Sequence, residues 1–224
     1  MHMNKNYCSL GLMSGTSCDG VDASIIVSNG EDNYNVILDK FFEYSKKTTQ
    51  NIQNLKEKIN NPKDLDSYLE EIKILEHEIT LFHSKVAKEV IEICKIDIDF
   101  IGFHGQTIFH NSKEKKTKQL GDANFLSKYT KKRVIYNFRQ NDLNNGGEGA
   151  PLAPIFHKLL IKQKKINLPA IILNIGGIAN ITLVDENFKL TSMDIGPGNC
   201  LIDKWIRLNT GKNFDKNGEL ARSG

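Results

Sequence analysis

The apolar positions at the start of the chain fall into three short runs separated by polar turns. Residues 7–13 are apolar, residues 21–27 are rich in β-branched side chains, and a third run covers residues 34–44. Runs of this length and composition predict β-strands. Between the first two runs, residues 14–20 are polar and include Gly15 and Gly20. The pattern therefore predicts a strand, a polar glycine turn and two further strands.

The same plan recurs near the other end of the chain. Two apolar strands are predicted within residues 170–184, joined by Gly176 and Gly177, and a third strand is predicted to end at Asp194 before a glycine loop. A helical pattern follows from residue 201 to 208, which places Asn199 or Cys200 near a helix N-terminus. A carboxylate beside a loop of backbone donors suits phosphate and metal chemistry. A structural hairpin with an aspartate cap fits the residues equally well.

The middle of the chain carries one long apolar stripe at helical spacing. Pro62 and Asp64 mark its start. A helix laid against a sheet is the commoner explanation of such a stripe, and a coiled-coil seam is the alternative. His77 and His83 lie on or near this helix, but their spacing is too loose for a metal-binding pair on one face. The stripe consists of Leu65, Leu69, Ile72, Ile79, Phe82, Val86, Val90 and Ile93.

Two further strands are predicted to end in polar segments. Residues 99–103 lead into His-Gly-Gln-Thr at 104–107, and residues 134–138 lead into Arg139 and a glycine-rich loop at 141–151. Ligands bind at this edge of open α/β sheets, and loops on a rigid scaffold often carry function. An apolar helix over 152–161 and a connector to residue 168 then lead into the second copy of the strand plan. We therefore predict an α/β chain of two similarly built lobes, 1–168 and 169–224.

Composition narrows the partners and the compartment. The chain has 224 residues, 25% of them charged, and a net charge of +3, which gives no argument for nucleic acid. The basic run 113–118 is interpreted as a solvated loop. No signal peptide or membrane span is indicated, and the four cysteines lack paired spacing, so a reduced cytoplasmic protein is expected. Residues 209–224 are polar, so the second lobe is expected to be incomplete.

Six segments of the chain, taken together, resemble one family: 11–22, 104–107, 138–139, 146–152, 174–180 and 194–199. With these segments the chain is similar to the anhydro-N-acetylmuramic acid kinases, which belong to the sugar-kinase, heat-shock-protein and actin superfamily. The resemblance implies a two-lobed, ribonuclease H-like fold with ATP in the cleft. It also implies phosphorylation of 1,6-anhydro-N-acetylmuramic acid with opening of its anhydro ring, a step of peptidoglycan recycling.

The resemblance also implies roles for individual residues. Asp194 matches the catalytic base, Asp19 is a candidate for positioning Mg²⁺, and Gly176 and Gly177 form a second phosphate loop. The first phosphate loop for ATP would comprise Gly15, Thr16, Ser17, Cys18, Asp19, Gly20, Val21 and Asp22. The sugar pocket would be lined by His104, Gln106, Thr107, Arg139, Gly147 and Gly149.

Each of these roles has a plainer alternative. His104 is also explained as a strand cap and Arg139 as an ion pair that braces the lobes. Asp142 is interpreted as an Asx-turn residue. Cys200 is a candidate reactive thiol only by its place near a helix N-terminus, with no base nearby in the sequence. Arg139 would suit the lactyl carboxylate of the sugar.

The chain departs from the family pattern at two positions. Asn137 stands where aspartate is usual and Glu148 where glutamine is usual. The family continues beyond the length of this chain into its adenine-binding part, so catalysis by this chain is a separate question. Two alternatives to the kinase remain: a nucleotide-driven ATPase of the actin or heat-shock type, and a catalytically inactive fragment of the kinase. The family resemblance also favours a homodimer.

Overall fold

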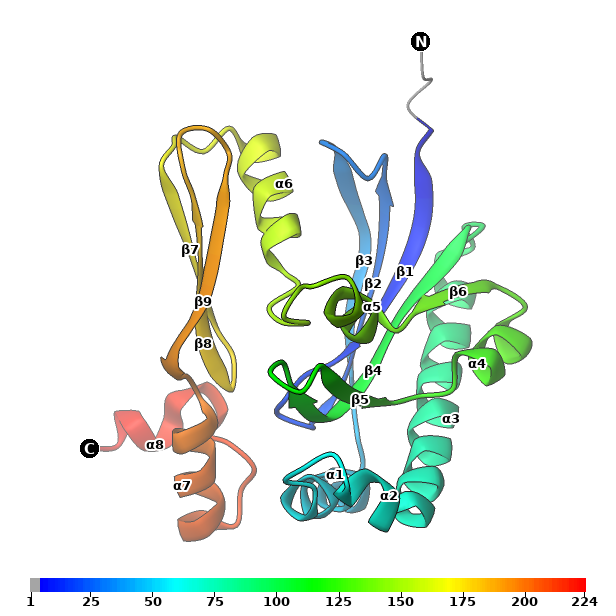
Figure 1. Cartoon of the computed structure of the whole chain (residues 1–224), viewed down its shortest axis with the longest axis vertical. Helices are drawn as coiled ribbons and strands as arrows, with labels where there is room; N and C mark the ends of the chain where they lie inside the picture. The colour runs from blue at the N-terminus through cyan, green and yellow to red at the C-terminus, as the bar shows by residue number, and fades with distance from the viewer. Residues whose placement is uncertain (1–4) are drawn as a thin grey trace. The chain divides into compact units, whose positions relative to one another are not determined.

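The chain forms two compact units that divide between Leu152 and Ala153. The computed structural model describes residues 5–224. The first unit is built on a mixed sheet, and the second on a three-stranded antiparallel sheet, with helices in both (Figure 1). The predicted α/β class is confirmed. Helix α6 (Pro154–Lys164) belongs to the second unit, whereas the sequence placed it in the first lobe, and the lobe boundary itself stays a prediction.

The sheet of the first unit has the strand order β3-β2-β1-β4-β5, and β6 pairs with the first part of β4. The first three strands form an antiparallel meander, whereas β1 and β6 run parallel to β4. An antiparallel meander β3-β2-β1 continued by the parallel strands β4 and β6 is the arrangement of a ribonuclease H-like sheet. The strands are β1 (Tyr7–Ser14), β2 (Gly20–Ser28), β3 (Tyr34–Glu43), β4 (Phe100–Asn111), β5 (Lys116–Leu120) and β6 (Arg133–Tyr136).

Along the residues that the structure describes, three helices of the first unit follow β3, one helix precedes β6 and one follows it (Figure 1). The stripe predicted from the sequence forms α3 from Leu69 onward, and α3 packs against the sheet rather than in a coiled coil. Leu65, the first residue of the stripe, lies in the separate helix α2. Helix α1 is not indicated by the sequence because it buries only two aliphatic side chains, Ile52 and Leu55, beside Thr48 and Thr49. The helices are α1 (Lys46–Lys58), α2 (Asp64–Ser67), α3 (Leu69–Cys94), α4 (Ala123–Thr130) and α5 (Phe138–Asn144).

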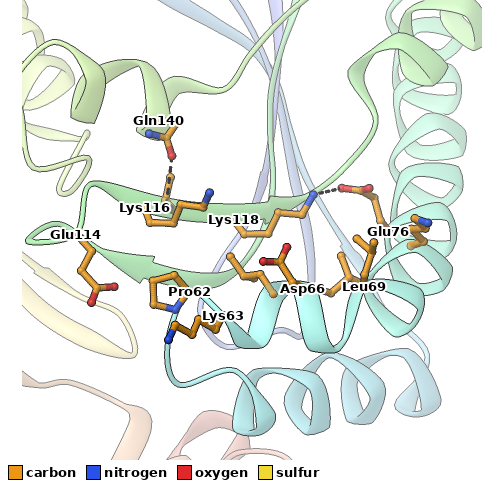
Figure 2. Close-up of a pocket in the computed structure, with 13 residues that line it drawn as sticks. Pro62, Lys63, Asp66, Leu69, Glu76, Glu114, Lys116, Lys118 and Gln140 are labelled. Carbon is orange, nitrogen blue, oxygen red and sulfur yellow. Dashed lines mark hydrogen bonds and ion pairs between the residues drawn. The ribbon is translucent and has the colours of Figure 1, made fainter.

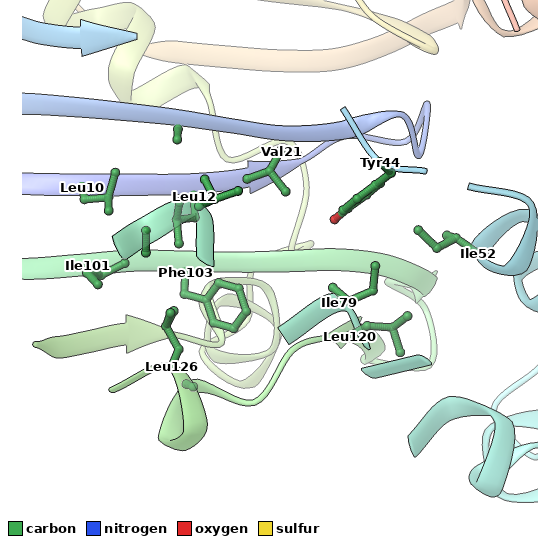
Figure 3. Close-up of a cluster of buried hydrophobic side chains, with 14 of the residues drawn as sticks. Leu10, Leu12, Val21, Tyr44, Ile52, Ile79, Ile101, Phe103, Leu120 and Leu126 are labelled. Atoms are coloured by element: carbon green, nitrogen blue, oxygen red, sulfur yellow. The ribbon is translucent and has the colours of Figure 1, made fainter. Parts of the chain in front are cut away.

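The core of the first unit lies between the sheet and α3 (Figure 3). Leu10 and Leu12 of β1 and Ile101 of β4 are buried there, together with Ile79 of α3. Burying each such side chain stabilises the fold by roughly 1.5–3 kcal/mol. The alternation along β1 ends at Ser14, which is also buried, so the strand delivers a polar side chain to the base of the first glycine turn.

The second unit repeats the meander of the first. Its strands are β7 (Ala170–Ile175), β8 (Ile178–Val184) and β9 (Leu190–Pro197), in the order β7-β8-β9. The His157 ring of α6 lies 2.8 Å from the hydroxyl of Thr182 on β8, so α6 packs on this sheet. The recurrence of strand, glycine turn and two further strands is confirmed. The chain continues with α7 (Cys200–Thr210), the 3₁₀ helix η1 (Lys216–Gly218) and α8 (Glu219–Arg222).

Four local predictions are wrong. β6 ends at Tyr136 and residues 138–144 form α5, so Phe138 does not end a strand and the loop predicted over 141–151 begins only after Asn144. β4 does not end before the His-Gly-Gln-Thr segment, because residues 106–111 pair with β5 in a hairpin. The basic run 113–118 is therefore the turn of that hairpin and the start of β5 rather than a free loop. Asp194 lies within β9 rather than at its end, because pairing with β8 continues to Pro197.

None of the helices formed by residues 5–224 is both long enough and apolar enough to cross a membrane.

Candidate functional site

The first glycine turn joins β1 to β2 and is held by its carbonyl oxygens. The carbonyl of Gly15 accepts from the side-chain amide of Gln106 at 3.0 Å, and that of Gly20 accepts from the Ser14 hydroxyl at 2.9 Å. The carbonyl of Asp19 accepts from the Tyr44 backbone N–H at 2.8 Å. Carbonyl oxygens repel anions, so a turn whose carbonyls are engaged elsewhere is suited to bind an anion through its N–H groups.

Lys56 of α1 provides a further contact to this turn. Its Nζ lies 3.2 Å from the carbonyl oxygen of Thr16 and 3.5 Å from Sγ of Cys18. No acidic side chain among residues 5–224 forms an ion pair with this ammonium group. Sequence reasoning missed Lys56, because nothing distinguishes it from the other lysines of a helix that the pattern did not reveal.

The side chains of the turn divide into buried and accessible ones. Cys18 and Val21 are buried, so their side chains are not available to a ligand. Cys18 has φ 59°, and its N–H donates to the Gly15 carbonyl at 3.2 Å. The Ser17 hydroxyl donates to Oδ1 of Asp19 at 2.6 Å. Gly20 is required because a Cβ atom there would clash with the Phe42 carbonyl and the Phe41 ring.

Carboxylates lie at the start of β2. Burial raises the pKa of Asp22, and the neighbouring charges of Asp19 and Asp39 raise it further. Among residues 5–224, no three His, Cys, Asp or Glu side chains converge on a metal-sized site. Mg²⁺ is commonly held by one or two carboxylates together with waters and substrate phosphates rather than by a closed protein cage. Asp19 fits that kind of donor set.

A buried polar cluster supports the turn from behind. The Ser14 hydroxyl lies 2.6 Å from the Tyr44 hydroxyl, and because Ser14 donates to Gly20, Tyr44 donates to Ser14. Burial raises the Tyr44 pKa far above its ordinary value. His83 is fully buried, Nδ1 lies 2.9 Å from the Ile79 carbonyl, and burial lowers its pKa to about 4. His83 is thus a satisfied core histidine.

The second group of predicted residues surrounds Arg139, at the start of α5. Its Nε donates to Nε2 of His104 at 2.8 Å, and its Nη1 donates to the Gly149 carbonyl at 2.7 Å. The alternative of an ion pair for Arg139 is not found, since no carboxylate among the described residues pairs with it. The structure therefore brings the His104 segment and the glycine-rich loop together through this guanidinium.

The glycine-rich loop is shaped by Asp142. Its Oδ2 accepts from the Gly149 N–H at 2.8 Å, and its backbone carbonyl accepts from the Gly147 N–H at 2.9 Å. Asp142 therefore organises the loop, but it does not form the predicted Asx turn, because its side chain accepts from an N–H seven residues further on rather than two. Glu148 is exposed, so its charge is solvated. Asn137 caps α5 with φ 63°, a conformation that asparagine tolerates better than most residues.

The remaining predicted sugar residues are placed differently. Gln106 is fully buried and holds the Gly15 carbonyl, while its own Oε1 has no hydrogen-bond partner among the described residues. The Thr107 hydroxyl accepts weakly from Gln119 at 3.3 Å. Gln106 therefore acts on the first glycine turn in this structure, and a direct contact of either residue with a sugar stays a prediction.

Two cavities adjoin each other near His104. The smaller, of about 240 Å³, is lined by His104, Asn137 and Gly121, and it shares Thr117, Lys118 and Gln140 with the larger. The larger, of about 770 Å³, lies among α2, the start of α3 and β5 (Figure 2). Lys118 reaches Glu76 across it at 2.7 Å. The larger volume is in the range of small-molecule pockets, roughly 300–1,000 Å³.

In the second unit, two glycine segments are bonded to each other. The N–H of Gly198 donates to the Gly177 carbonyl at 3.0 Å, and the N–H of Asn199 donates to the Gly176 carbonyl at 2.7 Å. A Cβ atom on Gly198 would clash with the Gly176 carbonyl, so glycine is required there. Asn199 is the N-cap of α7, as predicted. The turn and the loop after β9 therefore form one fixed backbone surface.

Asp194 lies opposite Asn180 on the neighbouring strand, and Asn180 lies opposite Asn174. The three residues therefore share one face of the sheet, at the end where the glycine turn lies. Asp194 is exposed. Its carboxylate is therefore accessible to a ligand.

Two α/β units that each contain the same meander, with a fixed glycine turn after its first strand, define the class of actin-like and sugar-kinase-like proteins. A model of the anhydro-N-acetylmuramic acid kinase family matches residues 7–224. The chain belongs to the anhydro-N-acetylmuramic acid kinase family.

Two curated relatives, both anhydro-N-acetylmuramic acid kinases, agree with this assignment. The anhydro-N-acetylmuramic acid kinase of Pelagibacter ubique is 59% identical over 224 residues, which cover 99% of this chain and 60% of that protein. That of Agrobacterium fabrum is 38% identical, covering 99% of this chain and 61% of that protein. The chain thus spans about 60% of the length of these relatives. A solved Ppx/GppA family structure from Aquifex aeolicus is similar with a TM-score of 0.42 and 10% identity, covering 89% of this chain and 54% of that one.

Proposed function

We propose that this chain carries the phosphate-binding and sugar-binding parts of a kinase that acts on 1,6-anhydro-N-acetylmuramic acid. The reaction consumes ATP and water, opens the 1,6-anhydro ring and gives N-acetylmuramic acid 6-phosphate and ADP. The observation that carries the proposal is that the family match extends over both glycine turns, Arg139 and Asp194. Such a reaction would serve peptidoglycan recycling.

The first glycine turn would bind the ATP phosphates. Gly15, Thr16 and Ser17 would supply backbone N–H groups and hydroxyls, because the carbonyls of the turn are engaged by Gln106, Lys56, Ser14 and Tyr44. Asp19 would hold Mg²⁺ directly or through water, and the ion would neutralise charge on the transferred phosphoryl group. The Gly176–Gly177 turn would supply a second set of backbone donors.

Asp194 would act as the general base. It would accept a proton from the water that attacks the anomeric carbon, so that the bond from this carbon to O6 breaks and O6 is freed to accept the γ-phosphoryl group. General-base assistance accelerates reactions by about 10²–10⁴-fold, so alignment and charge neutralisation must supply the rest. The exposed position of the Asp194 carboxylate supports this role.

Arg139 would bind the lactyl carboxylate of the sugar. It is a half-buried cation with no carboxylate partner of its own among the described residues. A charge in that environment is stabilised by an anionic ligand, and guanidinium groups suit planar carboxylates. Thr107, Gly147 and Gly149 would line the rest of the pocket.

Cellular context follows from the reaction. An ATP-dependent enzyme of sugar recycling would act in the cytoplasm, where ATP is available, and its partners would be small molecules rather than nucleic acid or a membrane. A homodimer is proposed only from the family resemblance.

The test is an ADP-release assay with and without 1,6-anhydro-N-acetylmuramic acid. It would use this chain and, for comparison, a fusion to the remaining part of the Pelagibacter ubique kinase. We expect ADP release to depend on the sugar and mass spectrometry to find the 6-phosphate. ATP hydrolysis that is indifferent to the sugar would favour the actin-like or heat-shock-like ATPase. Activity in the fusion alone would assign only binding to this chain.

A further inference from the structure

Arg139 is anchored by two neutral acceptors. Its Nε donates to His104 at 2.8 Å and its Nη1 to the Gly149 carbonyl at 2.7 Å. A guanidinium has five N–H groups, so both groups of Nη2 and one of Nη1 are not used by these two bonds. Neither anchor carries a negative charge, so the anchors fix the direction of the side chain without neutralising it.

His104 accepts this bond because its other nitrogen is committed. Its Nδ1 lies 2.7 Å from the Gly105 carbonyl oxygen, which only accepts hydrogen bonds, so Nδ1 carries the proton. Nε2 then presents a lone pair to Arg139. Burial lowers the pKa of His104 to about 4, and the Arg139 charge lowers it as well. The imidazole is therefore neutral, in a single tautomer, at physiological pH.

The two glycines beside these anchors are required by the backbone. Gly105 has φ +72°, and a Cβ atom there would clash with the Leu120 carbonyl. Gly149 has φ +70°, and a Cβ atom would crowd the His110 ring and Leu143 at 3.0 Å. One of these two glycine carbonyls orients His104, and the other accepts from Arg139. Both therefore belong to positions that only glycine can occupy without strain.

We propose that His104 is a positioning residue: it holds the Arg139 guanidinium in the orientation that receives a carboxylate, rather than contacting the ligand itself. The identity of the carboxylate as the lactyl group rests on the proposed function. A histidine that only filled space at this position would need neither the Nδ1 bond nor the lone pair toward Arg139. The two explanations differ in what happens when the nitrogens alone are removed.

The binding test compares two His104 variants. His104→Phe keeps a ring of similar size but removes both nitrogens, and His104→Gln restores an oxygen acceptor and an N–H donor. We measure calorimetric affinity for 1,6-anhydro-N-acetylmuramic acid and for 1,6-anhydro-N-acetylglucosamine, which lacks the lactyl carboxylate. We expect His104→Phe to lower the affinity for the carboxylate ligand about tenfold and the affinity for the neutral ligand less than about twofold. His104→Gln should bind both ligands with nearly the wild-type affinity.

The matched control is His77→Gln on α3, whose ring contacts Phe125 instead. It should change neither affinity. Equal weakening of both sugars in His104→Phe would show a general structural role and overturn the proposal. So would unchanged affinity for the carboxylate ligand.

A spectroscopic test does not depend on the sugar. Long-range ¹H–¹⁵N spectra of the labelled chain at pH 7 should show His104 protonated at Nδ1, and the Arg139 Nε–H signal should shift in His104→Phe but not in His77→Gln. An Nε2-protonated His104 would overturn the proposal. If the wild-type chain binds no sugar while the tautomer is as expected, the kinase function fails and the positioning of Arg139 stands.

Discussion

The ammonium group of Lys56 lies 3.2 Å from the carbonyl oxygen of Thr16, and this contact joins helix α1 to the first glycine turn. The same carbonyl also accepts from the Cys18 thiol at 3.3 Å. Because the Thr16 carbonyl oxygen accepts these two hydrogen bonds, it is engaged within the protein and does not face a bound phosphate. The contact also brings the positive charge of Lys56 to the turn. Helix α1 is thereby part of the candidate nucleotide site.

Replacing Lys56 tests this role. We expect Lys56→Met to weaken ATP binding about fivefold, because a hydrogen bond from a charged group contributes about 1–2 kcal/mol after allowance for partial exposure. Lys47→Met, at an exposed position on the same helix, is the matched control and should bind like wild type. Fluorescent-nucleotide titration measures both. Equal affinities in the two variants would remove Lys56 from the site.

Substitutions of Gly176 and Gly198 in the second unit should have separate effects on stability and on nucleotide binding. A Cβ atom on Gly176 would lie 3.7 Å from the Ile178 carbonyl oxygen, an ordinary van der Waals contact, whereas a Cβ on Gly198 would clash with the Gly176 carbonyl. We expect Gly198→Ala to lower the free energy of unfolding by about 1–3 kcal/mol. Gly176→Ala should leave unfolding nearly unchanged while weakening nucleotide binding about fivefold, because its methyl group blocks close approach of a phosphate.

Urea unfolding and nucleotide titration on both variants provide the comparison. If Gly176→Ala binds ATP as tightly as wild type, this turn is not a phosphate loop. If Gly198→Ala unfolds like wild type, the contact between the two glycine segments is not stabilising.

The role of Asp194 predicts a loss of turnover without a loss of binding. Asp194→Asn removes the proton acceptor but keeps the size of the side chain, so sugar-dependent ADP release should fall by about 10²–10⁴-fold. Nucleotide affinity should change little. Glu186→Gln removes an exposed carboxylate from the turn between β8 and β9 and serves as the control. Full turnover in Asp194→Asn would exclude this residue as the base.

The folded chain should lose stability as the pH falls from 6.5 to 4. The pKa values of His83 and His104 are lowered to about 4 by burial, from an ordinary value of 6.5. Between pH 6.5 and 4 the unfolded chain binds more protons than the folded chain, so the free energy of unfolding falls as the pH falls. The loss is up to about 3 kcal/mol for each histidine.

Urea unfolding at several pH values measures this loss. His83→Gln should flatten the dependence in this window, whereas His77→Gln should keep the wild-type slope. A variant at position 83 with an unchanged slope would show that His83 is not the buried neutral group responsible.

Local patterning made much of the fold predictable. The strands of both meanders and the long helix α3 follow from runs of apolar residues with strand or helix periodicity, which depend only on neighbouring positions. Helix α1 was not predicted because threonines complete its buried face. Strand β5 was not predicted because only Thr117 and Leu120 of its five residues are buried and the others are polar. The sequence also singled out His104, Arg139 and Gly149, but not the bonds that join them.

The sequence by itself determined the family, the repeated strand plan and the glycine turns, because motifs and periodicity are local properties of the chain. Only the tertiary structure decided which groups hold those turns and what Arg139 contacts. Lys56 and Thr16 are 40 positions apart, and His104 and Arg139 are 35 apart. Contacts at such separations depend on how the helices and strands pack, and no local pattern records that packing.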